Sequence, residues 1–262
     1  MSSQKSHKFT VGDLTISPLL LGEIEDTPQN WFEDTLAEVS GQLTRLPVIC
    51  LHVAGPDISV LIDACDPVQY PIAGANPANI HDALEAAGIC PGSITRVILT
   101  HGHHDHFCGV WNQSEQRPNF PDARHVLSSR DWDRGTLTKA AQIADGDAAD
   151  PKPLEKIHQM GLLDLDTNGL DLPTGIELLE APGETDGHRV VHISSGGQHF
   201  FFLADLFHVS AELNAPELCP IWADSSELRS SRAKVGELIR QTGAHFMCSH
   251  MAEVFTADEL AE

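Results

Sequence analysis

The sequence predicts an α/β fold in which strands and helices pack in layers. Its 262 residues are within the size of one large domain, and 41% of them are hydrophobic, which is enough to bury a large core. Short β-branched segments bounded by Gly, Pro or Asp predict strands in both halves of the chain, with helical patterns between them. This order favours two similar halves packed together. We therefore expect a single domain over residues 1–262.

The first half opens with predicted strands and then alternates. Residues 79–89 carry apolar side chains at helical spacing and end near Gly88 and Pro91, so they predict a helix. The segment RVILT predicts a buried strand that leads directly into His101. The Asp- and Pro-rich residues 145–153 predict an exposed loop. The strands expected here are 15–21, 47–55, 58–64, 96–100 and 123–129, and a second helix is expected at 153–161.

The second half predicts three strands, a helix and a final strand. The strands are IELLEAPG, RVVHISS and QHFFFLAD, between residues 176 and 205. Residues 225–243 begin with Ser, have an acidic first turn and end in Gly, which is typical of a helix. Residues 244–250 predict a last buried strand. Functional residues gather at strand ends in α/β folds, so the polar residues there are site candidates.

Charge and composition limit the partners. The chain has 16 Lys and Arg against 38 Asp and Glu, a formal net charge of −22. Such a surface repels nucleic acids and anionic membranes, so we expect a small-molecule partner, no nucleic acid and no membrane. The N-terminal sequence is polar and no segment is long and apolar enough to span a bilayer, which predicts a cytoplasmic protein. The six cysteines form no C-x-x-C pair and are expected to be reduced.

The segment ILTHGHHDHFCG holds four histidines and one aspartate within six consecutive positions. Alternate side chains of an extended segment share one side, so His101 and His103 can reach one centre while His104 points away. Asp105 and His106 follow where the chain is expected to turn. Imidazole and carboxylate suit zinc, with iron or manganese as alternatives. The pattern predicts a metal site, and a histidine loop without metal is the alternative explanation.

Three further polar residues end predicted strands or follow them in a turn: His188, Asp205 and His250. An aspartate at the end of the apolar segment HFFFLAD needs a partner, because an unpaired buried charge is costly. Taken singly, each of the three is more easily explained as a structural residue, but their shared position favours one site. His245 begins the strand that His250 ends, so we prefer His250. His208 is a candidate substrate contact or an ordinary surface histidine.

These motifs resemble those of one family. THGHHDH, PGETDGH, the aspartate of FLAD and the histidine of CSH have the order and approximate spacing of the metallo-β-lactamase fold superfamily of hydrolases. FPDARHVLSSRDWD and LADLFHVSAEL resemble its lactonase and organophosphate-hydrolase members. The resemblance implies a four-layered αβ/βα sandwich of two mixed sheets with outer helices. It also implies a metal-dependent hydrolase.

The resemblance implies two divalent metal ions, expected to be zinc, with iron or manganese as alternatives. Seven ligands exceed the four positions of one tetrahedral zinc but divide between two metals that share a carboxylate. Asp105 or Asp205 is expected to orient the attacking metal-bound hydroxide, and Asp63 to orient a ligand histidine or to cap a turn. The implied ligands are His101, His103 and His188 for the first metal and Asp105, His106 and His250 for the second, with Asp205 bridging.

The chain departs from the usual motifs at several positions. Glu184 and Asp186 replace the first His and the second Pro of P-G-H-T-P-G-H, and neither position is normally a ligand. The usual D-T-G is residues 63–65, Asp-Ala-Cys, and the usual G-G is Cys-Gly at 108–109. Many acyl-homoserine lactonases of this fold use a tyrosine near the metals, whereas the only tyrosine here is Tyr70. This weakens a specific lactonase assignment.

The expected reaction is hydrolysis of an ester, a lactone or a related small substrate. The sequence lacks G-x-S-x-G and phosphate-loop or dinucleotide motifs, so serine nucleophiles and nucleotide chemistry have no support. The alternatives are a phosphoester or organophosphate hydrolase of the same fold, an iron-dependent oxidoreductase of the sulfur dioxygenase type, and a metal-binding sensor without catalysis. The oligomeric state is left open, with a dimer among the options.

Overall fold

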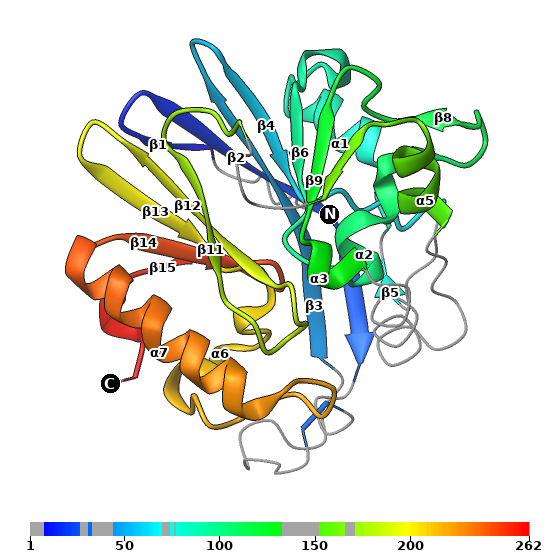
Figure 1. Cartoon of the computed structure of the whole chain (residues 1–262). Coiled ribbons are helices and arrows are strands. Elements are labelled where there is room, and N and C mark those ends of the chain that lie inside the picture. The colour runs from blue at the N-terminus through cyan, green and yellow to red at the C-terminus, as the bar shows by residue number, and fades with distance from the viewer. Residues whose placement is uncertain are drawn as a thin grey trace.

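The protein is described by a computed structural model covering residues 8–26, 31–32, 44–69, 74–75, 77–132, 152–165 and 171–261. Most of the predicted loop at 145–153, and Tyr70, lie outside these ranges. Within them the chain forms two large mixed β-sheets, with helices on the outer face of each sheet (Figure 1). None of the helices in these ranges is both long and apolar enough to cross a membrane.

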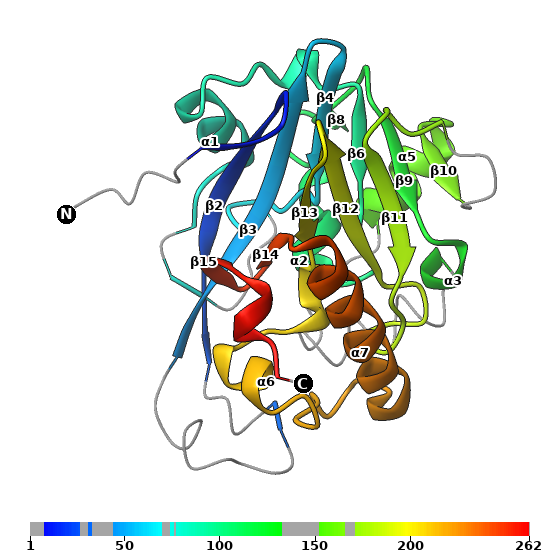
Figure 2. The ribbon, with the colours of Figure 1, turned by 90° about the vertical axis from the view of Figure 1, so that its left-hand side faces the viewer.

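The first sheet has eight strands, of which seven follow the order β1-β2-β3-β4-β6-β9-β10, while β5 pairs with β2. The pairs from β1 to β4 are antiparallel, and the pairs from β4 to β10 are parallel. In Figure 2 the long strands β2 and β3 extend beyond the rest of the sheet. The strands are β1 (Phe9–Val11), β2 (Leu14–Asp26), β3 (Thr44–Gly55), β4 (Ile58–Ile62), β5 (Gly74–Ala75), β6 (Arg96–Ile98), β9 (Arg124–Leu127) and β10 (Leu163–Leu165).

The second sheet has five strands in the order β11-β12-β13-β14-β15. Only β13 and β14 run parallel, so their carboxyl ends lie side by side. A separate two-stranded sheet pairs β7 (Trp111–Asn112) with β8 (Arg117–Pro118). The strands of the second sheet are β11 (Ile176–Glu180), β12 (Arg189–Ser195), β13 (Gln198–Phe202), β14 (His245–Cys248) and β15 (Met251–Phe255).

The helices occupy the two outer layers. Figure 1 shows α7 against the second sheet and α1 and α5 on the far side of the first sheet. Short 3₁₀ turns connect several elements, among them η5 (Ala204–Leu206). The helices are α1 (Ile80–Ala86), α2 (His104–Phe107), α3 (Ser129–Trp132), α5 (Lys152–Gln159), α6 (Ser210–Asn214) and α7 (Ser225–Thr242).

The two sheets and the two outer helix layers make four layers, and three apolar clusters fill the spaces between them. Leu84 of α1 and Ile157 of α5 pack against the outer face of the first sheet, and Ile239 of α7 packs against the second sheet. The cluster between the sheets contains residues of both, including Ile98 and Phe202. Because strand side chains alternate and both faces are covered, these strands are continuous apolar runs. The four-layered αβ/βα sandwich that the sequence predicted is confirmed.

Each predicted strand and helix within the described ranges is present, with ends that differ by a few residues. Gly243 has a φ of 61° just after α7, the left-handed conformation of a helix-ending glycine. The strands β1, β5, β7, β8, β10 and β15 were not predicted. Each has five residues or fewer, and such short segments carry little periodicity.

We expect His125 to make the fold sensitive to acid. Its ring is buried on β9, and burial lowers its pKa from an ordinary 6.5 to about 4. Between these two pH values the unfolded chain binds a proton that the folded chain excludes, so stability falls as the pH falls through this window. We expect a contribution of about 3 kcal/mol.

The measurement is the free energy of unfolding by urea at pH 7 and at pH 4 for wild type and H125Q. The decrease between the two pH values should be smaller in H125Q by that amount. Equal decreases in both proteins would contradict this role of His125.

Candidate metal centre

The histidine-rich segment leaves the end of β6 and enters α2. His103 has an extended backbone (φ −77°, ψ 148°) and precedes the helix, whereas Asp105 and His106 lie in its single turn. The side chains of His101 and His103 meet, with Nε2 of the first 2.9 Å from Nδ1 of the second. The ring of His104 lies against Phe107, with centroids 5.5 Å apart. His101 and His103 therefore face each other while His104 points away from them, as predicted.

The second sheet contributes Asp205 and His250 from the ends of adjacent parallel strands. Asp205 lies in η5, directly after β13, and His250 follows β14. A hydrogen bond from Ser249 N to Ala204 O, 3.0 Å long, joins the two loops. His245 lies exposed at the other end of β14, so the choice of His250 over His245 agrees with the structure.

The buried ligand candidates form two groups of four that share Asp205. Within each group, one potential ligand atom per residue lies within 4.8 Å of all the others. Asp205 Oδ2 is 3.1 Å from His106 Nε2, 3.3 Å from His250 Nε2 and 3.6 Å from His101 Nε2. The groups are His101, His103, Glu184 and Asp205, and Asp105, His106, Asp205 and His250.

Six of the seven predicted ligands thus fall into these groups, and His188 lies beside them. Its Nδ1 donates to Ala181 O at 3.0 Å, so Nε2 carries the free lone pair. That Nε2 accepts a hydrogen bond from Asp205 N at 3.2 Å. The rings of His188 and His101 are 5.0 Å apart. A ligand role for His188 therefore stays a prediction, and Glu184 stands in the first group where His188 was expected.

The carboxylates make this region strongly attractive to positive charge. Burial alone would raise the pKa of Asp105, but the neighbouring His106 and His250 lower it to about 2. Burial alone would lower the pKa of His250, but the charges and hydrogen bonds of Asp205 and Asp105 raise it to about 9. Asp105 is therefore ionised at neutral pH, and the carboxylates stabilise positive charge beside them.

The residues present fit a pair of divalent cations. Asp205 Oδ1 and Glu184 Oε2 are buried and have no hydrogen-bond partner among the residues that the structure describes. Leaving buried carboxylate oxygens unsatisfied is costly, and a metal ion would satisfy them. Imidazole with carboxylate is a donor set typical of zinc, iron and manganese.

Asp63 contacts one of the ligand candidates, which is one of the two roles that the sequence left open for it. It lies just after β4 with a φ of 61°, a conformation uncommon outside glycine. Its carboxylate lies 2.8 Å from His106 Nδ1 and accepts a hydrogen bond from Thr100 N, also 2.8 Å long. Because Nδ1 faces this carboxylate, the Nε2 of His106 points to Asp205.

Asp131 holds together the two loops that carry His101, His103 and Glu184, a role that was not predicted from the sequence. Its buried carboxylate accepts from Gly102 N at 2.9 Å, Thr185 Oγ1 at 2.7 Å and Gly187 N at 2.7 Å. A Cβ on Gly187 would lie 2.7 Å from Asp131 Cγ, so only glycine fits there. The position of Asp131 just after the strand predicted at 123–129 could have identified it, because functional residues gather at the ends of strands.

Cys65 and Cys108, which replace glycines of the usual family motifs, pack against each other. The sulfur atoms of Cys65 and Cys108 lie 3.8 Å apart in the core behind the histidine segment. Gly109, which follows Cys108, lies close to the backbone of residues 64–65. It donates to Ala64 O at 2.7 Å, and a Cβ there would lie 2.7 Å from the carbonyl carbon of Cys65. Glycine is needed for this close backbone approach.

His208 is buried beside the metal centre. Its Nε2 lies 3.4 Å from Glu184 Oε1 and 3.6 Å from Asp205 Oδ2. Trp31 and Trp222 contact its ring edge to face, at 5.7 and 5.8 Å. The interpretation of His208 as an ordinary surface histidine is therefore wrong.

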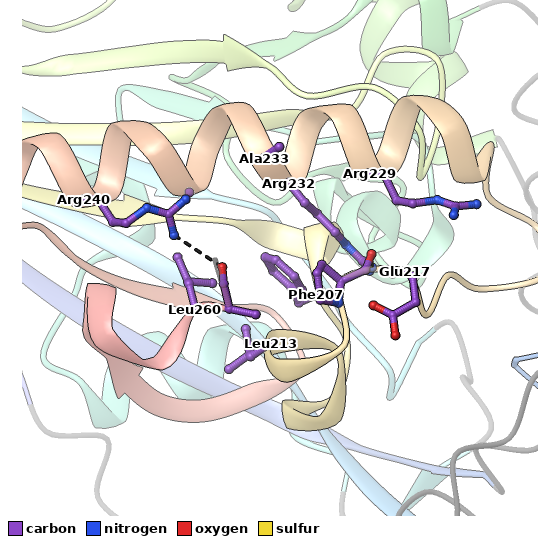
Figure 3. Close-up of a pocket in the computed structure, with 11 residues that line it drawn as sticks. Phe207, Leu213, Glu217, Arg229, Arg232, Ala233, Arg240 and Leu260 are labelled. Carbon is purple, nitrogen blue, oxygen red and sulfur yellow. Dashed lines mark hydrogen bonds between the residues drawn. The ribbon is translucent and has the colours of Figure 1, made fainter.

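A buried ion pair between Glu212 and Arg232 holds the backbone of His208 in place. Glu212 accepts from the backbone nitrogen of His208 and pairs with Arg232 of α7. Arg232 also donates to Leu206 O at 2.8 Å. Figure 3 shows Arg232 beside Phe207 at a cavity of about 260 Å³ under α7, and its guanidinium carbon is 4.6 Å from the ring centroid of Phe207. The helix thereby fixes the loop that follows Asp205.

The family model of the metallo-beta-lactamase superfamily matches residues 43–241. The hydrolase AbOPH of the beta lactamase superfamily is 19% identical, with a TM-score of 0.83, and the alignment covers 100% of this chain and 97% of AbOPH. No sequence match is found among curated proteins.

Two other solved structures share the fold. AidC, described as a dizinc quorum-quenching lactonase in complex with the product N-hexanoyl-L-homoserine, is 21% identical, with a TM-score of 0.79 and coverage of 93% of this chain and 90% of AidC. A probable metal-dependent hydrolase from Staphylococcus aureus is 19% identical, with a TM-score of 0.74 and coverage of 92% and 91%. At these identities the likeness establishes the fold.

Proposed function

Given that this chain belongs to the metallo-β-lactamase superfamily of hydrolases, we propose that it uses two divalent cations to hydrolyse a small ester or lactone. The observation that carries this proposal is the pair of buried ligand groups sharing Asp205. Two groups around one carboxylate are the arrangement expected of a binuclear hydrolase. The proposal treats residues 1–262 as one domain, because both sheets contribute ligands.

Zinc is the metal we propose for both positions. The imidazole and carboxylate donors support it, and AidC, which shares the fold, is described as a dizinc enzyme. When bound, the cations would supply Lewis-acid polarisation of the substrate and activation of water at neutral pH. We keep the predicted ligand set of seven, listed as His101, His103, Asp105, His106, His188, Asp205 and His250.

The protein's own residues position the reaction. We assign Asp105 and Asp205 the catalytic roles, since each carboxylate can accept a hydrogen bond from the attacking water and orient it. Asp105 Oδ2 is 3.4 Å from His250 Nε2 and 3.5 Å from His106 Nε2, which holds it at the second ligand group. Asp63 keeps His106 in its orientation through the 2.8 Å contact at Nδ1.

The substrate class rests on two arguments. The lactonase AidC is described with a homoserine product, which supports a lactone or ester. The net charge of −22 disfavours polyanionic partners such as nucleic acids. The cytoplasmic location and the absence of nucleic-acid and membrane partners stay predictions. Phosphoester hydrolysis and iron-dependent oxidation are the alternatives that the experiment must separate.

Metal removal provides the test. Metal content is measured on purified protein, and turnover is measured on a panel of acyl-homoserine lactones, aryl esters and phosphotriesters, before and after chelation. We expect about two metal equivalents per chain and lactone or ester hydrolysis that chelation abolishes and zinc restores.

Other outcomes would show that a different function is correct. Oxygen uptake with an iron-loaded protein would favour the oxidoreductase, and a preference for phosphotriesters would favour the organophosphate hydrolase. Turnover that survives complete metal removal would refute the metal-dependent mechanism. Tight metal binding without any turnover would favour a sensor.

A further inference from the structure

The cavity of about 260 Å³ under α7 has no role in the proposed reaction. Its inner wall is apolar, because Phe207, Leu213 and Leu260 belong to the buried cluster between α7 and the second sheet. Figure 3 shows these three side chains below the helix. Sites for drug-sized ligands have volumes of about 300–1,000 Å³, so this cavity suits a somewhat smaller molecule.

The face of α7 above the cavity combines small residues with arginines. Ala233 and Gly236 line the middle of the cavity, and Arg229 and Arg240 line it on either side of them. Steps of three or four residues place these side chains on one face of the helix. A Cβ on Gly236 would have the guanidinium of Arg240 as its nearest neighbour, at 3.4 Å. The guanidinium of Arg240 therefore lies back over the space that the small residues leave.

One end of the cavity carries a positive charge that no lining carboxylate offsets. Arg232 pairs with Glu212, which neutralises it. Figure 3 shows Arg229 and Glu217 at one end of the cavity and Arg240 at the other. Among the described residues that line the cavity, Glu217 is the only acidic one. The end at Arg240 is therefore positive, in a chain whose formal net charge is −22.

Arg240 has donors left for a ligand. Its Nη1 donates to Ala261 O at the long distance of 3.4 Å, and its Nε lies 3.8 Å from Glu237 Oε2, which is too far for a hydrogen bond. The guanidinium makes no other hydrogen bond or ion pair with the residues that the structure describes. Its planar fork of N–H donors matches the two oxygens of a carboxylate.

Ordinary surface arginines beside an imperfectly packed helix are the competing explanation. Arginines often lie along apolar surface with the charged group in water. This explains Arg229, which is exposed and whose Nε donates to Ser225 O in the preceding turn of the helix. It does not explain why the guanidinium of Arg240 turns back over Gly236 toward an apolar cavity.

We propose that this cavity binds a monocarboxylate with an apolar tail, with the carboxylate on Arg240 and the tail toward Phe207 and Leu213. One negative charge matches the one guanidinium that is not offset, and the apolar wall matches a hydrocarbon chain. Glu217 at the opposite end disfavours a second carboxylate on the ligand. The inference goes beyond the proposed function, because the metal centre takes no part in it.

The test is calorimetric titration of the full, metal-containing protein with octanoate as the probe. Butanoate keeps the carboxylate and shortens the tail by four methylene groups, whereas 1-octanol keeps the tail and lacks the charge. Octanoate should bind at least about tenfold more tightly than butanoate, because each buried methylene group adds affinity. It should also bind at least about tenfold more tightly than 1-octanol, because hydrogen bonds to charged groups are the stronger class.

Three variants locate the site. R240Q should weaken octanoate binding by about tenfold, and by more than R229Q does, because Arg240 holds the carboxylate. A233L fills the cavity without changing a charge and should weaken binding by at least about tenfold. K234Q is the matched control for R240Q, because Lys234 is exposed on α7, does not line the cavity and carries the same charge. It should bind octanoate as wild type does.

The proposal is overturned if octanoate does not bind the wild-type protein. Octanoate held at the metal centre would keep its affinity in R240Q and in A233L, and this result would also overturn the proposal. An equal loss in R240Q and K234Q would reveal a general effect of charge and would contradict a site at Arg240. If A233L does not fold, as judged by circular dichroism, the comparison of R240Q with R229Q and K234Q decides. The titration measures no turnover, so failure of the proposed hydrolysis leaves this inference intact, and the reverse also holds.

Discussion

Replacing Asp205 by Asn is expected to reduce turnover by more than about a hundredfold and to lower the metal content of the purified protein. Asp205 is the one residue common to both ligand groups, and its carboxylate lies within 3.6 Å of His101, His106 and His250. Changes to outer partners of a metal already cost about 10–100-fold, so removal of a shared charged ligand should cost more. Metal analysis and steady-state kinetics on the substrate panel measure both effects.

Asp57→Asn is the matched control, because Asp57 is exposed in the turn between β3 and β4 and the substitution removes the same charge. It should retain metal and activity. A D205N protein that keeps two metals and full turnover would refute the bridging assignment.

Replacing Asp131 by Ala is expected to destabilise the fold by about 3 kcal/mol or more and to weaken metal binding as well. The substitution leaves the donors of Gly102, Thr185 and Gly187 without their buried acceptor, and each unsatisfied buried donor costs about 1–3 kcal/mol. The two loops that carry His103 and Glu184 then lose their common anchor. Urea unfolding and metal titration of D131A measure the two effects.

Asp131→Asn separates loop anchoring from charge. The amide keeps one acceptor oxygen, so D131N should be less destabilised than D131A. If D131A unfolds at the same urea concentration as wild type, Asp131 does not anchor the loops.

Much of the fold could be predicted because its signals are local. The run of apolar residues in QHFFFLAD identifies a strand covered on both faces, and the structure confirms it: Phe201 packs toward α7 while Phe200 and Phe202 face the other sheet. Asp224, the capping residue of α7, accepts from the nitrogens of Ser226 and Glu227, a local arrangement that depends on neighbouring residues only. The four-layered arrangement came from the family resemblance, since strand order and sheet pairing involve residues far apart in the chain.

The contacts that set the geometry of the candidate site could not be predicted in the same way. Asp131 lies 54 residues before Thr185, and its role appears only when β9 and the loop after β11 come together. Glu184 was passed over because the resemblance gave that position no ligand role, yet the structure places its carboxylate 3.3 Å from His103. His208 was left undecided because its burial depends on Trp31 and Trp222, which are distant in sequence.

The sequence by itself determined the types of ligand and the segment that brings most of them together. Three of the four histidines and the aspartate in the six positions 101–106 need only the local backbone to come together, and the positions of Asp205 and His250 at the ends of apolar strands made them ligand candidates. The bridging position of Asp205 came from the family resemblance, whereas the tertiary structure alone decided that Glu184 and not His188 lies among the first group and that Asp131 joins the loops. The reason is that these relations are distances between separate strand ends. Packing of the two sheets fixes such distances, and local spacing does not.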